Sequence, residues 1–160
     1  MSSAESSAAI VAACQAATAR IAAGDPAGAM RLLAEPLARQ PRDPNLLYVA
    51  GNAALAGGDA AAATGYYERS VAAASTFVAA LANLGFVLRL EQRLEEARTV
   101  LRRAVTLEPE HVSAWVNLVS CHVNEGEPEA GERVAREALA VHPDDAVLHW
   151  NLAQIGRAHV

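Results

Sequence analysis

The chain has 160 residues with a formal net charge of -5, and 52% of its residues are hydrophobic whereas only 4% are aromatic. This apolar content excludes intrinsic disorder, and no apolar run approaches the roughly 20 residues that a membrane-spanning helix needs. All 13 basic residues are arginine, which excludes chemistry that depends on a lysine amine. An acidic chain without a basic stripe also argues against nucleic acid as a partner.

A repeat with a period of about 34 residues runs through the chain. Asn83, Asn117 and Asn151 recur at this interval, and a leucine follows each of them. Pro109 and Pro143 are separated by the same interval. Several residue types that coincide at one period indicate a repeat architecture, in which each repeat is one supersecondary unit.

The middle of each repeat is marked by a residue suited to a turn. Gly24, Gly58 and Gly126 keep one phase of the repeat, and Gln92 fills the remaining slot. The segments on either side are rich in alanine and apolar at helical spacing, without the alternating β-branched runs of strands. Each repeat is therefore predicted to be two helices joined at these positions.

The third and fourth repeats carry the most distinctive pattern. Residues 81–85 read Leu-Ala-Asn-Leu-Gly and their repeat closes at Pro109, whereas residues 115–118 read Trp-Val-Asn-Leu and theirs closes at Pro143. This pattern resembles the tetratricopeptide repeat family, in which a bulky residue, a leucine and a small residue mark the first helix. The resemblance implies an all-α fold, a right-handed α-solenoid of about four helix-turn-helix repeats with a C-terminal capping helix.

The repeats follow from this phase in chain order. They are predicted, within a single domain of residues 1–160, at 10–43, 44–77, 78–111 and 112–145, with the capping helix at 146–160.

The two ends of the array are expected to depart from the pattern. Pro36 falls inside the second helix of the first repeat, where proline costs about 3 kcal/mol, so this helix is expected to kink or stop early. The end faces are expected to expose apolar side chains, Ile10 at one end and Leu148 and Ile155 at the other. Through these faces the chain could form a homo-oligomer.

The resemblance places partner binding on a concave groove that the first helix of each repeat lines. Asparagines at one phase would form a ladder that pairs with the backbone of an extended peptide, similar to the ladder of O-GlcNAc transferases. Asparagine is also common at this phase without such a role, and that alternative stays open. The predicted partner-binding residues are Asn83, Asn117, Asn151, Asn52, Tyr48, Phe86, Arg89 and Trp150.

No catalytic constellation is predicted, and neither a metal site nor a cofactor. The five histidines and two cysteines lack metal-ligand spacing, and Cys121 and His122 are adjacent, so their side chains diverge on a helix. Both cysteines are expected to be free thiols.

Charge is distributed unevenly between the third and fourth repeats. An acidic ligand of the third repeat and a solvated outer helix face are both compatible with this pattern. The arginines are Arg89, Arg93, Arg98, Arg102 and Arg103, and the glutamates of the fourth repeat are Glu125, Glu127, Glu129, Glu132 and Glu137.

The favoured function is a non-enzymatic protein–protein interaction scaffold that binds a peptide or partner helix in the groove. Two alternatives are the substrate-recognition module of a larger bacterial protein O-glycosyltransferase and a secretion chaperone built of the same repeats. The early charge is the acidic Glu5 rather than a basic signal region, so a cytoplasmic location is expected.

Overall fold

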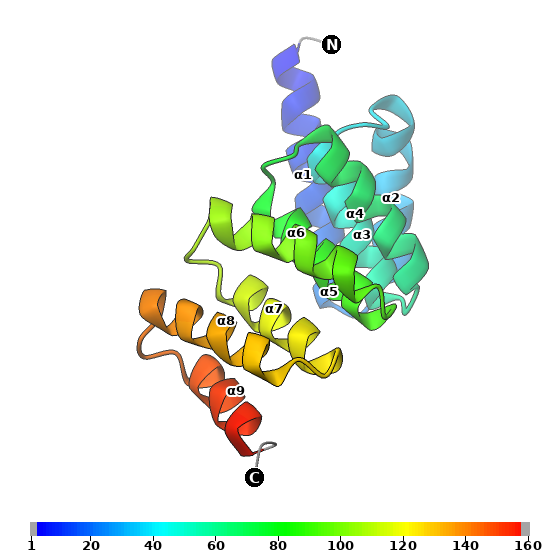
Figure 1. Cartoon of the computed structure of the whole chain (residues 1–160). Coiled ribbons are helices and arrows are strands. Elements are labelled where there is room, and N and C mark those ends of the chain that lie inside the picture. The colour runs from blue at the N-terminus through cyan, green and yellow to red at the C-terminus, as the bar shows by residue number, and fades with distance from the viewer. Residues whose placement is uncertain (1–2, 158–160) are drawn as a thin grey trace. The chain divides into compact units, whose positions relative to one another are not determined.

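The computed structural model describes residues 3–157, which form nine α-helices and no strand (Figure 1). The helices are α1 (Ser3–Ala22), α2 (Pro26–Arg39), α3 (Pro44–Ala56), α4 (Ala60–Ala73), α5 (Val78–Leu90), α6 (Leu94–Leu107), α7 (Val112–Asn124), α8 (Pro128–Val141) and α9 (Ala146–Arg157). The predicted all-α secondary structure agrees with this part of the chain.

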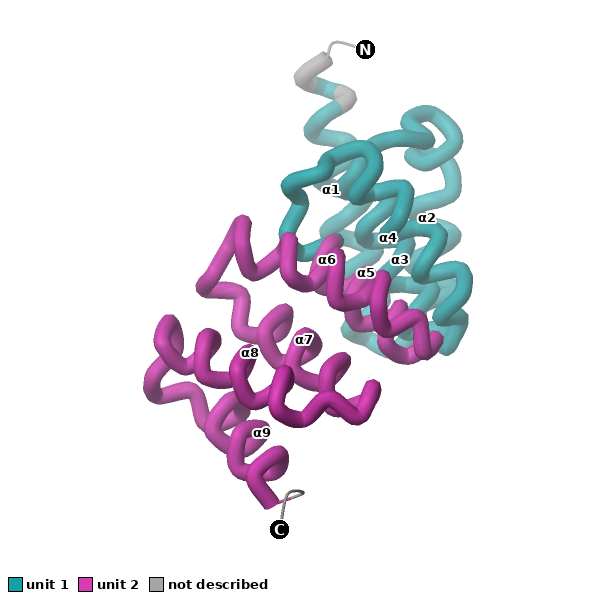
Figure 2. Tube along the Cα trace, in the orientation of Figure 1, with its two compact units in different colours: residues 1–80 teal, residues 81–160 magenta. Residues whose placement is uncertain are grey.

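The chain forms two compact units, residues 1–80 and 81–160 (Figure 2). In the first unit, α1 packs on α2 and α3 on α4, and α3 also contacts both α1 and α2. In the second unit, α7 packs on α8 and contacts α6, and α9 contacts both α7 and α8. Each unit is therefore a stack of helical pairs. We call α1, α3, α5, α7 and α9 the first helices.

The turn inside each pair uses a left-handed residue, as the sequence predicts. Gly24, Gly58 and Gly126 have φ angles of 76°, 83° and 75°, and Gln92 adopts the same conformation with φ of 62°. Glycine occupies this region without steric cost, whereas the Cβ of any other L-residue is crowded there. The turn between α5 and α6 is therefore the one strained turn among the four.

The two helices of a pair approach closely because a small residue on one faces a large residue on the other. Tyr67 of α4 is fully buried, and a Cβ added to Gly51 of α3 would lie 2.5 Å from its ring. Leu101 of α6 crowds Gly85 of α5 in the same way. The repeat phase gives these two pairs equivalent positions, so the close approach is a recurring element of the fold.

Helix α2 runs through Pro36 to Arg39, so the predicted early stop of this helix is wrong. Pro36 falls in the last turn, where its missing N–H removes one hydrogen bond, and its carbonyl accepts a hydrogen bond of 2.8 Å from the Gln40 N–H. Leu33 is fully buried and Leu37 packs against the same core cluster. The burial of these leucines holds the turn in the helix.

The closing proline of the third repeat anchors the next repeat. Trp115 of α7 is 6% exposed, and its indole Nε1 donates a hydrogen bond of 2.8 Å to the carbonyl of Pro109. A buried tryptophan usually needs a partner for this N–H. The loop between α6 and α7 supplies it.

The substitution Gln92→Gly is expected to raise the free energy of unfolding by about 0.5–1 kcal/mol. It removes the left-handed penalty of a side chain, and the larger backbone entropy of glycine in the unfolded chain offsets part of the gain. Urea unfolding followed by circular dichroism measures the change. The matched substitution Gly126→Gln should lower stability, and a stabilising Gly126→Gln would contradict this explanation.

Candidate functional site

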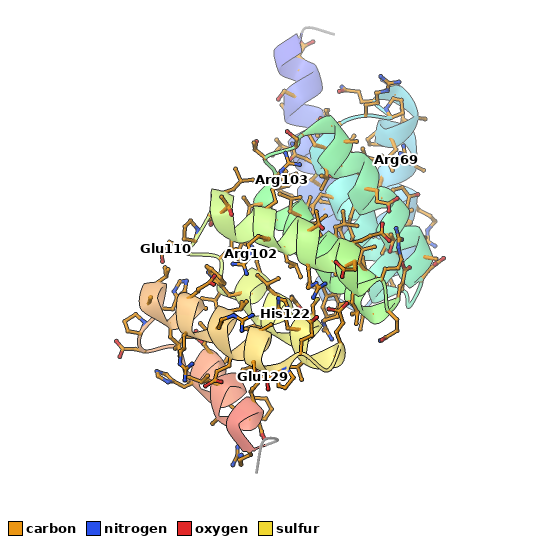
Figure 3. The ribbon with its side chains drawn as sticks, in the orientation of Figure 1. Arg69, Arg102, Arg103, Glu110, His122 and Glu129 are labelled. Atoms are coloured by element: carbon orange, nitrogen blue, oxygen red, sulfur yellow. The ribbon has the colours of Figure 1, made fainter. Side chains whose placement is uncertain are left out.

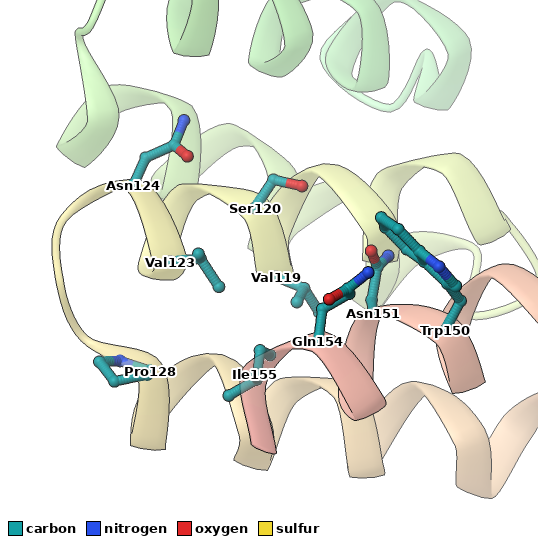
Figure 4. A pocket seen from close by; sticks show the side chains of 9 residues that line it. All are labelled: Val119, Ser120, Val123, Asn124, Pro128, Trp150, Asn151, Gln154 and Ile155. Atoms are coloured by element: carbon teal, nitrogen blue, oxygen red, sulfur yellow. The ribbon is translucent and has the colours of Figure 1, made fainter. Parts of the chain in front are cut away.

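A pocket of about 330 Å³ lies between the first helices α7 and α9 of the second unit. Figure 4 shows that the two helices face each other across it, with one residue of α8 at its end. We call it the α7/α9 pocket. Its lining residues are Val119, Ser120, Val123, Asn124, Pro128, Trp150, Asn151, Gln154 and Ile155.

The α7/α9 pocket exposes mainly apolar surface, and none of its lining residues is charged. Ile155 is 4% exposed and Val119 2% exposed, so they form its floor. Trp150 is 58% exposed and Val123 44% exposed, which makes them rim residues. Pockets of this size with apolar walls and few polar groups are typical of binding sites.

One polar atom of the α7/α9 pocket lacks a partner. The Asn151 side-chain nitrogen Nδ2 is buried and makes no hydrogen bond with any residue that the structure describes. A buried N–H without an acceptor costs about 1–3 kcal/mol.

The other predicted asparagines have partners within the chain. The Asn117 amide donates a hydrogen bond of 2.9 Å to the carbonyl of Ser113 in its own helix. Asn52 accepts a hydrogen bond of 2.7 Å from the Tyr67 hydroxyl, and Asn83 also interacts within the chain. Of the four asparagines, Asn151 alone has a buried amide nitrogen without a partner among the described residues. The ladder as a binding surface stays a prediction.

The first unit has a corresponding apolar pocket of about 320 Å³ between α1 and α3. Tyr48 lines it, with its ring centroid 5.0 Å from that of Phe77 and 6.1 Å from that of Tyr67. Cys14 also lines this pocket, and burial raises the pKa of its thiol, with a smaller effect of the Asp43 charge. Tyr48 is therefore both a packing residue and a wall of this pocket.

The remaining predicted residues lie on α5. The Arg89 guanidinium lies over the Phe86 ring, 5.4 Å from the ring centroid, in a cation–π contact. Its Nε atom is buried without a hydrogen-bond partner among the described residues. This contact fixes the orientation of the charge.

The arginines of α6 pair with the glutamates of the following repeat. Arg98 contacts Glu125 at 2.5 Å and Glu127 at 2.8 Å, and Arg102 contacts Glu137 at 2.6 Å. Figure 3 labels Arg102 and His122 among the side chains of the chain. The Arg98 side chain is 18% exposed, so its charge is only partly screened. The ion pairs of Arg98 and Arg102 thus join the helical pair of the third repeat to that of the fourth.

The same cluster has the spacing of a metal site. One ligand atom from each of His122, Glu125 and Glu127 lies within 4.8 Å of the others. Arg98 contacts both carboxylates, and its Nη1 is 3.4 Å from His122 Nδ1, so a guanidinium group already pairs with the cluster. The hydrogen bond from His122 lowers the pKa of Glu127, and the Arg98 charge lowers it further. A structural ion-pair cluster explains this geometry.

Both cysteines are free thiols, and Cys121 is fully buried. Burial raises the pKa of the Cys121 thiol to about 11. The thiol is therefore protonated at neutral pH, which does not suit a nucleophile.

The prediction that Ile10, Leu148 and Ile155 form exposed apolar end faces is wrong. Leu148 is fully buried and Ile155 is 4% exposed, because both turn inward onto the preceding helical pair. Ile10 is partly buried against the core of the first unit. On α9, the large exposed apolar side chains are Val147 and Trp150.

The sequence analysis missed several pocket residues. Val119, Val123 and Pro128 were not singled out, although Val119 and Val123 lie on the predicted first helix of the fourth repeat. Their helical spacing fits ordinary core packing, so the sequence alone gave no signal that a cavity remains between α7 and α9.

Sequence models of the tetratricopeptide repeat match residues 14–76 and 88–155, which together make up most of the chain. The chain belongs to the tetratricopeptide repeat family. Repeats of this family typically mediate protein–protein interactions. No curated protein matches the sequence. Among the described residues, no helix has both the length and the apolar character to cross a membrane.

Solved tetratricopeptide structures share the fold. PilF of Pseudomonas aeruginosa has 20% identity and a TM-score of 0.87 over 97% of this chain and 71% of that protein. MamA of Desulfovibrio magneticus RS-1 has 21% identity and a TM-score of 0.82 over 94% and 85%. A Thermobaculum terrenum O-GlcNAc transferase mutant has 23% identity and a TM-score of 0.77 over 88% of this chain and 27% of the enzyme. The predicted tetratricopeptide solenoid class is confirmed.

The substitution Arg98→Met is expected to lower the free energy of unfolding by about 1–2 kcal/mol. The methionine keeps part of the packing of the arginine side chain but leaves Glu125 and Glu127 without their cation. The expected loss lies between those of exposed and fully buried ion pairs, because the burial of this pair is intermediate. Chemical unfolding at low and high salt measures the loss, which should shrink at high salt.

The matched control is Arg103→Met on the exposed side of the same helix. Its effect should stay within about 0.5 kcal/mol, as for ordinary surface positions. Equal losses for both variants would contradict the role of Arg98.

Proposed function

We propose that the chain is a non-enzymatic interaction module that binds a segment of a protein partner on its first helices. The α7/α9 pocket carries this proposal, because an apolar cavity with an exposed tryptophan at its rim is costly to leave open to water. Aromatic side chains at such positions are frequent hot spots of protein interfaces.

The chemistry of the titratable groups supports a binding role over catalysis. In the one cluster of three potential ligand residues found in the described chain, both carboxylates are paired with Arg98. The Cys121 thiol is buried and protonated at neutral pH. These groups stabilise the fold where they lie.

The alternative of a glycosyltransferase recognition module rests on the asparagine ladder. Asn117 donates to its own helix, which reduces what it can offer to a peptide backbone. The likeness to the Thermobaculum terrenum enzyme extends to the fold alone. A secretion chaperone is a special case of the binding role, in which the partner is a secreted protein.

The substitution Trp150→Ser is expected to abolish capture of the partner. It removes the largest exposed apolar side chain of the pocket rim, and alanine-scan losses at such anchors are at least about 2 kcal/mol. Affinity capture from the native cell lysate, quantified by mass spectrometry, compares the variant with the wild-type chain.

The control is Leu107→Ser at the end of α6, since Leu107 is 44% exposed and does not line the pocket. This variant should capture the partner as the wild type does. If Trp150→Ser and Leu107→Ser both capture the wild-type set of proteins, the α7/α9 pocket is not the binding surface.

A further inference from the structure

We propose that the first unit holds a separate binding site, a pocket between Arg42 and Arg69 that takes a phosphate monoester with an apolar group on its ester oxygen. The pocket has a volume of about 480 Å³ and joins the loop between α2 and α3 to the last turns of α4. We call it the Arg42/Arg69 pocket. It shares no residue with the α7/α9 pocket and does not depend on the function proposed there. Its lining residues are Pro41, Arg42, Leu47, Arg69, Ala72 and Ala73.

The two arginines of this pocket have no acidic partner. Arg93, Arg98 and Arg102 in the second unit each pair with a glutamate. Neither Arg42 nor Arg69 forms an ion pair with any carboxylate that the structure describes. None of the lining residues is acidic. The pocket therefore carries two positive charges that its own lining does not offset.

The acidic residues next to these arginines in the sequence, Asp43 and Glu68, do not line the pocket. The Asp43 Oδ1 atom accepts hydrogen bonds of 3.0 Å and 2.9 Å from the N–H groups of Asn45 and Leu46. These bonds cap the first turn of α3, which satisfies backbone donors that have no partner inside the helix. The carboxylate closest to Arg42 in the sequence thus serves α3.

The fold holds Arg69, which is labelled in Figure 3, in place without a ligand. Its Nη2 atom donates a hydrogen bond of 2.9 Å to the carbonyl of Pro41, and its guanidinium carbon lies 5.7 Å from the centroid of the Tyr66 ring. A guanidinium has five N–H donors, so this hydrogen bond leaves donors for a ligand. A side chain that is already oriented loses less conformational entropy on binding.

The same positions of the fourth repeat explain why the second repeat has room here. By repeat phase, Leu47 and Pro41 correspond to Trp115 and Pro109. The Trp115 indole donates a hydrogen bond of 2.8 Å to the carbonyl of Pro109. Leucine is smaller and has no donor, and the Pro41 carbonyl accepts from Arg69 instead. The guanidinium has thus taken over the role of the indole, beside a smaller side chain.

The charge at these positions is also reversed between the two repeats. Arg42 and Arg69 correspond to Glu110 and Glu137. Glu137 pairs with Arg102 at 2.6 Å, and the Glu110 Oε2 atom lies 3.8 Å from His142 Nδ1. The two cations are therefore a feature of the second repeat and not of the repeat pattern. A ligand that fits this pocket does not fit the fourth repeat.

Two charges and an apolar floor select the ligand. A phosphate monoester carries a charge of about −1.5 to −2 at pH 7 with three acceptor oxygens, and guanidinium groups match phosphate geometry. A carboxylate or a sulfate ester brings a single charge. Leu47 is 1% exposed and forms the floor, and Pro41, Ala72 and Ala73 add apolar surface. An aryl or alkyl group next to the phosphate gains from burial against this surface.

The substitution Arg42→Gln should weaken the binding of phenyl phosphate about tenfold, because it removes one charge-assisted contact. Arg42 is exposed, so the melting temperature of the free chain should stay the same. The matched control is Arg31→Gln, which removes the same charge from an exposed position of α2 that does not line the pocket. This variant should bind phenyl phosphate as the wild type does.

The substitution Leu47→Trp transfers the residue of the fourth repeat into the pocket. It should fill the pocket and block binding. Circular dichroism checks that this variant is folded, since Leu47 is in the core. If it does not fold, the comparison of Arg42→Gln with Arg31→Gln still decides the proposal.

Isothermal titration calorimetry on the full chain at neutral pH compares phenyl phosphate with phenyl sulfate and inorganic phosphate. Phenyl phosphate should bind at least about fivefold more tightly than either, because the sulfate ester has a single charge and inorganic phosphate has no apolar group. A capped peptide Gly-Ser-phosphotyrosine-Ser-Gly separates two sources of the ester. Tighter binding of the peptide than of phenyl phosphate indicates a phosphorylated protein side chain, and weaker binding indicates a small phosphorylated molecule.

The proposal is overturned if neither phenyl phosphate nor the phosphopeptide binds. It is also overturned if phenyl sulfate binds as tightly as phenyl phosphate, which would show general attraction of anions. Equal losses of affinity for Arg42→Gln and Arg31→Gln would contradict it as well, because the pocket would then have no special role.

Discussion

The close approach of the two helices in each pair is the constraint on which the rest of the structure depends. Gly51 under the Tyr67 ring and Gly85 under Leu101 bring two backbones together at one level of the repeat. At the same two positions of the fourth repeat stand Val119 and Ala135, both buried, so the large and small partners have exchanged helices. One position of each pair holds a small residue and the other a larger one, so the side chains still fill the space between the helices although the residues change, as close packing requires.

Val119 connects this exchange to the α7/α9 pocket. It is buried on α7 and also lines the pocket. The pocket also differs from the neighbouring turn in charge. Arg98 joins α6 to the turn before α8 by pairing with Glu125 and Glu127, and the lining of the pocket contains no charged residue.

The repeat period predicts the fold because each period of the sequence corresponds to one helix-turn-helix unit of the structure. Left-handed turns at Gly24, Gly58 and Gly126, and even at Gln92, were predictable because one phase of the sequence carries them all. The course of α2 past Pro36 was not predictable, since the burial of Leu33 and its neighbours outweighs a local penalty. The inward orientation of Leu148 and Ile155 also depends on packing against α7 and α8. The repeat phase predicted Trp150 and Asn151 as binding residues. Only the three-dimensional structure shows that the side-chain amide of Asn117 has a hydrogen-bond partner and that of Asn151 has none among the described residues.

The contrast between the two tryptophans gives the molecule two separate optical reporters. Trp115 is enclosed and tied to the Pro109 carbonyl, so its fluorescence should emit at short wavelength and resist a soluble quencher such as iodide. Trp150 stands in water at the pocket rim, so it should emit further to the red and be quenched readily. Quenching thus isolates the signal of the pocket, while the protected emission of Trp115 follows the integrity of the helical stack.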